Sequence, residues 1–339
     1  MHIVSGLFAR RIIGTAFPWI RRGIFLGSLV AFGWIASGAF QSTGNLSNVR
    51  WVPFIGAFAL QLILTLLLML FWERLLSIFW YGASEGRDKY LRTDLYTAFS
   101  RSWLARYLPG RLWALGGRVL LASKAGVSAE AVARSGAFEI LFSYGTITIL
   151  GLALTLATKV NIWAGAGTLL AGGVAFAISV PLAQRILSSG NLRASHNSRW
   201  NRIRFRAQRF LVGVNSLSLT DTVWWTGLYC LHTSFQLLFI VLIAESFVDL
   251  TLSQAVTIAG VWGLSLTLGW LSFLTPAGLG VREGLALVFF TQVLDAPTVI
   301  LVIAASRIVM TVSDLAFVGA VELLAMGVNF KRTQPQSSA

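Results

Sequence analysis

Two short stretches of the sequence combine arginine with a proline-glycine break. The first, "RYLPGRLWALGGR", covers residues 106–118, and the second, "LTPAGLGVREG", covers residues 274–284. A broken helix exposes backbone N–H groups at the start of its next half, and these groups together with the helix dipole attract anions. A guanidinium group holds phosphate oxygens through two parallel hydrogen bonds. Both stretches therefore indicate binding of a phosphate-bearing ligand.

The first stretch contains an arginine that is expensive to bury. Arg118 lies well inside the segment that follows the break, where an arginine costs at least ~2.5 kcal/mol on the mildest membrane scale. It therefore needs an acidic partner, water or a ligand. Arg106 has a structural alternative, because its long side chain can extend to the interface and merely fix the depth of the helix. The candidate binding residues of this stretch are Tyr107, Pro109, Gly110, Arg111 and Arg118.

In the second stretch, the candidate binding residues are Pro276, Gly278, Gly280, Arg282 and Glu283. The alternative is that Arg282 and Glu283 form only a charge pair at a helix start. Three charges inside later apolar segments, Glu139, Arg307 and Asp314, are candidates for lining or coupling a transport path. Such residues are expected to face the protein interior. Here too a structural ion pair is the alternative, with Glu139 contacting Arg307 across the two halves of the chain.

The composition places these residues in a membrane. The chain has 339 residues, of which 56% are hydrophobic and 12% charged, and its mean hydropathy is +0.73. Soluble domains carry roughly 25% charged residues. Segments of about 20 apolar residues cross a bilayer, and they must be helical because lipid offers the backbone no hydrogen-bond partners. Such apolar runs cover residues 24–40, 51–72, 140–157, 160–183 and 222–244.

The distribution of charge predicts the orientation. The net charge of +14 comes mainly from arginines between the apolar runs, in the N-terminal region, after the second run and over residues 185–209. Because cytoplasmic loops are enriched in Lys and Arg, we expect these segments, and both termini, on the cytoplasmic side of the plasma membrane. The N-terminal run resembles a secretory signal, but we expect it to remain as the first span.

Two segments are too short to cross, at 112–123 and 284–294, and each follows a proline-glycine break. We expect an all-α polytopic membrane protein with about six full transmembrane helices and two re-entrant hairpins. Residues 1–158 and 159–330 would be inverted repeats within a single membrane domain, as in many transporters, followed by a short cytoplasmic tail over 331–339. The alternative is that 254–294 forms two full spans.

Signals for enzymatic chemistry are few. The sequence has no Walker loop and no HExxH. With one cysteine and three scattered histidines, a metal site is not expected, and we predict no cofactor and no catalytic activity. The basic and aromatic stretch at 197–210 is interpreted as lying on anionic lipid headgroups, so nucleic acid is not an expected partner.

The two break motifs resemble those of the lysylphosphatidylglycerol synthase transmembrane-region family, which includes the flippase portion of the bacterial multiple peptide resistance factor. The matching residues are Tyr107, Pro109-Gly110 and Arg118 in the first motif, and Pro276, Gly278, Gly280, Arg282 and Glu283 in the second. Ala277 departs from the family, which often has glycine there. The resemblance implies movement of an aminoacylated phospholipid or a polyprenyl-phosphate sugar between leaflets. The aminoacyl-transfer domain of the full-length synthases has no counterpart here, so transferase activity is not implied.

The sequence therefore favours translocation of an anionic phospholipid or lipid-linked phosphate headgroup, with membrane lipids as partners. Two other classes remain open. The protein could be a scaffold or accessory subunit for a separately encoded lipid- or glycan-modifying enzyme, or a membrane enzyme acting on polyprenyl phosphates. The identity of the headgroup, the energy source and the oligomeric state are not fixed by the sequence.

Overall fold

The computed structural model describes residues 49–80, 92–107, 112–189, 217–272 and 280–333, and for 112, 183–189 and 329–333 it describes the backbone alone. This part of the chain is entirely helical, with nine α-helices and a short 3₁₀ turn, Ala105–Tyr107. The helices are α2 (Trp51–Trp80), α3 (Arg92–Leu104), α4 (Leu112–Lys124), α5 (Ala129–Lys159), α6 (Ile162–Ser189), α8 (Leu219–Glu245), α9 (Leu252–Leu271), α10 (Val281–Phe290) and α11 (Ala296–Thr333).

Six of the described helices are long and apolar enough to cross a membrane, namely α2, α5, α6, α8, α9 and α11. The prediction of a multi-pass helical membrane protein is confirmed at this level. The predicted run at 24–40 lies outside the described residues. At the C-terminal end, α11 continues to Thr333. The first residues of the predicted tail, 331–333, therefore belong to this helix.

The remaining three helices are short. Helices α3 and α4 have 13 residues each and α10 has 10, so they extend only about 15–20 Å at 1.5 Å per residue. The predicted segments 112–123 and 284–294 correspond to α4 and α10. Helix α9, which precedes α10, is longer than one arm of a re-entrant hairpin needs to be. It has 20 residues, which is enough to span the membrane. The alternative of two full spans over 254–294 does not fit α10.

Side-chain caps define where several helices begin. Ser218 and Asp221 form a reciprocal capping box at the start of α8. Before α11, Asp295 accepts a hydrogen bond from the backbone N–H of Thr298 at 3.1 Å. This N–H donation lowers the pKa of the Asp295 carboxyl below its ordinary value, because it favours the ionised form. The cap fixes the sharp change of direction between α10 and α11.

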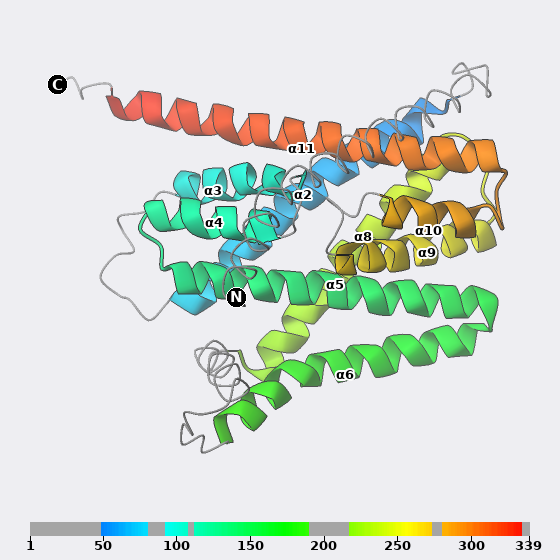
Figure 1. Ribbon diagram of the computed structural model, residues 1–339, viewed down its shortest axis with the longest axis horizontal. Helices are drawn as coiled ribbons and strands as arrows, with labels where there is room; N and C mark the ends of the chain where they lie inside the picture. The colour runs from blue at the N-terminus through cyan, green and yellow to red at the C-terminus, as the bar shows by residue number, and fades with distance from the viewer. Residues whose placement is uncertain (1–48, 81–91, 108–111, 190–216, 273–279, 334–339) are drawn as a thin grey trace, which may run out of the picture.

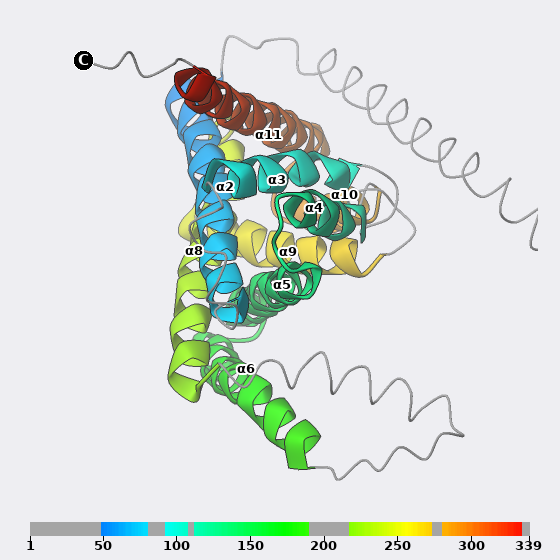
Figure 2. The same ribbon diagram turned by 90° about the vertical axis from the view of Figure 1, so that its left-hand side faces the viewer.

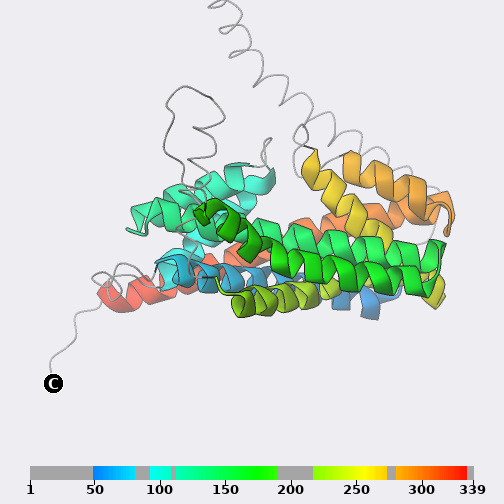
Figure 3. The same cartoon turned by 90° about the horizontal axis from the view of Figure 1, so that it is seen from below.

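Two pairs of neighbouring helices, α3–α4 and α9–α10, occupy the middle of the bundle. Figure 1 shows α3 and α4 toward one end of the long axis and α9 and α10 toward the other, all of them between α11 and α5. Helix α3 packs on α11 and α4 on α5, while α10 packs on α11 and α9 on α5. Figure 2, viewed along the bundle, shows α2 and α8 side by side on one flank, and Figure 3 shows α5 and α6 running together along the molecule.

Glycines bring α5 and α9 into backbone contact. A Cβ atom at Gly260 would meet the backbone nitrogen of Thr155 at 2.8 Å, and one at Gly263 would meet the Cα of Gly151 at 3.1 Å. Small residues of this kind allow close helix packing in membranes. The contact sets the position of α9, and therefore of the residues at its inner end, relative to α5.

We predict that Gly260→Ala destabilises the protein by about 1–3 kcal/mol, because the added methyl group collides with a backbone that cannot move alone. The measurement is the thermal unfolding midpoint in detergent. Gly167→Ala in α6 is the matched control, since a Cβ there meets nothing within 4 Å. Equal midpoints for the two variants would contradict the close α5–α9 contact.

Candidate functional site

A cavity of about 260 Å³ lies between the α3–α4 pair and the α9–α10 pair, and residues of α2, α3, α4, α5, α8, α9, α10 and α11 line it. Its charged lining comes from five separate parts of the chain: the turn after α3, then α4, α5, α10 and α11. These residues are Arg106, Arg118, Glu139, Arg282 and Arg307. The structure thus brings together one predicted arginine from each break motif. It also places there the predicted path residues Glu139 and Arg307.

Arg118 forms a buried ion pair with Glu139. Both residues are almost fully inaccessible, at 4% and 6% exposure. The guanidinium carbon of Arg118 lies 4.2 Å from the ring centre of Phe99 and 5.0 Å from that of Trp72, in the geometry of cation–π contacts. Arg118 is therefore neutralised by a carboxylate and enclosed by aromatic rings, with its Nε atom lacking a hydrogen-bond partner among the described residues.

The alternative pairing of Glu139 with Arg307 is wrong. Glu139 contacts Arg118, and Arg307 contacts Glu283, so each pair joins a short helix to the long helix that follows it. The physical reason is packing. Helix α4 lies against α5 and α10 against α11, which places the partner on the short helix closer than the charge on the other long helix.

Asp314 joins α11 to the end of α3. Its fully buried carboxylate accepts hydrogen bonds from Trp103 Nε1 at 2.9 Å and from the Tyr107 hydroxyl at 2.5 Å. It also pairs with Arg106 at 2.9 Å. Arg106 stays partly accessible, with 24% of its side chain exposed, and lines the cavity. Arg106 therefore pairs inside the protein, which differs from the alternative in which its side chain extends to the membrane interface. Asp314 does not line the cavity and holds the turn after α3 against α11.

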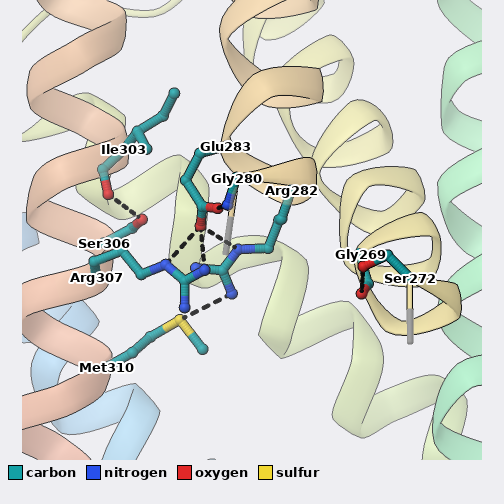
Figure 4. Close-up of polar contacts among 9 residues, drawn as sticks. All are labelled: Gly269, Ser272, Gly280, Arg282, Glu283, Ile303, Ser306, Arg307 and Met310. Carbon is teal, nitrogen blue, oxygen red and sulfur yellow. Dashed lines mark hydrogen bonds and ion pairs between the residues drawn. The ribbon is translucent and has the colours of Figure 1, made fainter. Parts of the chain in front are cut away.

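Arg282, Glu283 and Arg307 form a triad in which two cations share one carboxylate (Figure 4). Glu283 Oε1 accepts from Arg282 Nε at 3.1 Å and from Arg307 Nε at 2.5 Å. Its other oxygen accepts from the backbone N–H of Gly280 at 2.8 Å. Glu283 therefore caps the start of α10 and also bridges to α11, so the alternative of a helix-start charge pair describes only part of its role.

The surroundings of Arg282 leave part of its guanidinium free. The group lies 4.7 Å from the ring centre of Trp262 and contacts the sulfur of Met310 at 3.8 Å. Gly269 makes room for it, since a Cβ there would meet the Cβ of Arg282 at 3.1 Å. The Nη2 atom of Arg282 is buried and has no hydrogen-bond partner in the described part of the chain. Arg282 thus brings a buried, unpaired donor to the lining of the cavity, as Arg118 does with its Nε atom.

Gly280 supplies the turn into α10. Its φ of +86° lies in the region that residues with a Cβ rarely adopt. The positive φ turns the backbone N–H toward Glu283 and orients the first turn of the helix, from which Arg282 projects. The remaining candidates of the break motifs, Pro109, Gly110, Arg111, Pro276 and Gly278, lie outside the described residues.

Sequence reasoning missed the polar and aromatic part of the lining that comes from the spans. Tyr144 on α5 stacks against Trp270 on α9 with ring centres 4.7 Å apart. His232 also belongs to the lining, and its Nε2 atom lies 3.2 Å from the carbonyl oxygen of Leu64. A polar residue inside an apolar run is the sequence feature that could have identified further lining residues. The missed lining residues of this kind are Gln61, Thr65, Thr233 and Gln236.

Guanidinium groups that converge on a space in an apolar bundle have the chemistry to bind an anion. Within the described ranges, no group of three His, Cys, Asp or Glu residues is suited to hold a metal ion. Comparisons of the chain with protein-family models, with curated proteins and with solved structures find no match. The resemblance to a lipid-flippase family stays an inference from the two break motifs.

We predict strong non-additivity between Arg118 and Glu139. Arg118→Met and Glu139→Leu should each cost about 3–5 kcal/mol of stability, because each leaves a buried charge without a partner. The double variant should cost clearly less than the sum, because it removes both charges. Denaturant unfolding in detergent measures the four members of this cycle. Additive effects would show that the two side chains do not interact.

Proposed function

We propose that this protein translocates an anionic phospholipid or lipid-linked phosphate headgroup between the leaflets of the membrane. The observation that carries the proposal is the internal cavity lined by Arg118 from one break motif and Arg282 from the other. Burying several arginines in an apolar bundle is costly, and charged residues inside membranes usually mark a substrate path. Arginine is also the side chain best matched to phosphate.

Two inverted halves are part of this proposal. Arg50, just before α2, contacts Val248 and Asp249, just after α8, at 2.8 and 2.5 Å, so the two helices run antiparallel. Lys159, at the end of α5, contacts Gln292, just before α11, at 3.2 Å, which favours the same relation for those two helices. Opposed directions are what an axis in the membrane plane requires of equivalent helices.

The packing of the short helices follows the same pattern. The contact of α3 with α11 corresponds to that of α9 with α5, and the contact of α4 with α5 corresponds to that of α10 with α11. We propose that α3–α4 and α9–α10 are hairpins entering from opposite sides of the membrane. Their inner ends would then meet at a midplane headgroup site.

The size of the cavity suits a headgroup alone. A volume of about 260 Å³ is slightly below the roughly 300–1,000 Å³ of typical small-ligand pockets, so acyl chains would stay in the bilayer. In the proposed mechanism Arg118 and Arg282 hold the phosphate, with Tyr107, Gly280 and Glu283 supporting them. Glu139, Arg307 and Asp314 set the polarity of the path or couple it to an ion.

The proposed setting is the plasma membrane, with both termini cytoplasmic. The family resemblance supports an aminoacylated phospholipid or a polyprenyl-phosphate sugar as the transported lipid. It also supports a role without catalysis, in which a separately encoded enzyme modifies the lipid. A scaffold for such an enzyme would need no anion site inside the bundle, and the transport experiment distinguishes the two functions.

We predict that Arg282→Ala slows lipid translocation at least about tenfold, because it removes the cation with a free donor and leaves Glu283 with one partner fewer. The assay uses vesicles containing the purified protein and fluorescent phosphatidylglycerol, with the outer label destroyed by a reductant that does not cross the membrane. Arg118→Ala should act in the same direction. Arg282→Lys should be intermediate, because lysine keeps the charge but loses the forked donor geometry.

Arg101→Ala is the matched control, because it breaks an exposed pair with Glu322 that contributes little. It should transport at the wild-type rate. Labelled phosphatidylcholine, which has no net charge, should move more slowly than phosphatidylglycerol. Unchanged transport in folded Arg282→Ala and Arg118→Ala, or no transport by the wild type, would refute the proposal and favour the scaffold.

A further inference from the structure

The charges at the cavity do not balance. Within the described residues, four guanidinium groups line it, and three carboxylates pair with them. The surrounding bundle contributes mainly apolar and uncharged polar side chains. With His232 neutral, the lining and its paired carboxylates carry one positive charge. The four cations are Arg106, Arg118, Arg282 and Arg307, and the three anions are Asp314, Glu139 and Glu283.

The excess charge has a defined place. Asp314 pairs with Arg106 and Glu139 with Arg118, one carboxylate for one cation in each case. Glu283 alone serves two cations, Arg282 and Arg307. The uncompensated positive charge therefore belongs to the triad, where Arg282 Nη2 is buried without a hydrogen-bond partner from the described chain.

We infer that the site selects a headgroup with a single negative charge, a phosphodiester, over a phosphomonoester or a diphosphate. This inference rests on the proposed binding of a phosphate headgroup in the cavity. One monoanion makes the loaded cavity neutral, whereas a dianion leaves one negative charge in an apolar bundle. The desolvation penalty of an ion grows with the square of its charge, while its attraction to the triad grows only in proportion to the charge. Going from a monoanion to a dianion therefore raises the desolvation penalty about fourfold but the attraction only about twofold.

Competition for binding tests this charge selection without requiring transport. The probe is fluorescent phosphatidylglycerol bound to the purified full-length protein in detergent. The competitors are dihexanoyl phosphatidylmethanol, a diester, and dihexanoyl phosphatidic acid, a monoester with the same chains that is largely dianionic at about pH 8. We expect the diester to compete at least about tenfold better. Equal competition by the two lipids, or better competition by the monoester, would overturn the inference.

Changing the charge count should change the preference. Glu139→Gln removes one carboxylate and raises the excess to two positive charges, so the preference for the diester should narrow by about tenfold or reverse. Asp314→Asn makes the same change from another position and retains an acceptor for Trp103 and Tyr107. Either variant suffices if the other does not fold. An unchanged preference in a folded variant contradicts the inference.

One control separates the charge of the cavity from other effects. Glu322→Gln removes a carboxylate from an ion pair that does not line the cavity and should leave the preference unchanged. If the preference holds but vesicles show no translocation, the proposed transport fails and the charge selection stands. If translocation occurs with no preference between the esters, only the charge selection fails.

Discussion

The interaction on which the structure depends is the pairing of buried guanidinium groups with carboxylates inside an apolar helical bundle. An isolated charge in such surroundings costs several kcal/mol even after relaxation, so each arginine constrains where its partner must lie. Arg118 ties α4 to α5, Glu283 and Arg307 tie α10 to α11, and Asp314 ties the end of α3 to α11. The same pairs that hold the short helices in place also build the lining of the cavity.

These constraints explain which features were predictable. The spans follow from apolar runs alone, because lipid admits only helices at that depth, and the runs at 51–72 and 222–244 correspond to α2 and α8. The short helices α4 and α10 follow from proline-glycine breaks that precede segments too short to cross. The sequence did not decide whether α9 is one arm of a hairpin or a full span. Its 20 residues contain no break or charge that distinguishes the two.

Partner assignments were beyond the sequence for a geometric reason. Asp314 lies 211 and 207 positions from Trp103 and Tyr107, and no local periodicity connects residues so far apart. Equivalent places in the two halves suggested Glu139 and Arg307 as partners. The two ion pairs instead have opposite polarity: the carboxylate is on the long helix in the first pair and on the short helix in the second. The sequence shows the sign of each charge but not which residue it contacts.

The unequal sharing of carboxylates has a mechanistic consequence. A cation with its own carboxylate, such as Arg118 with Glu139, must give up that partner before it can hold a ligand fully, and the released carboxylate then opposes an incoming anion. A cation that shares its carboxylate can accept an anion while the existing contacts remain, as Arg282 can with Glu283 still bound to Arg307 and to the N–H of Gly280. In the proposed transport, we therefore expect the first capture of the anion at α10, and the pair between α4 and α5 would engage the headgroup only at a later step.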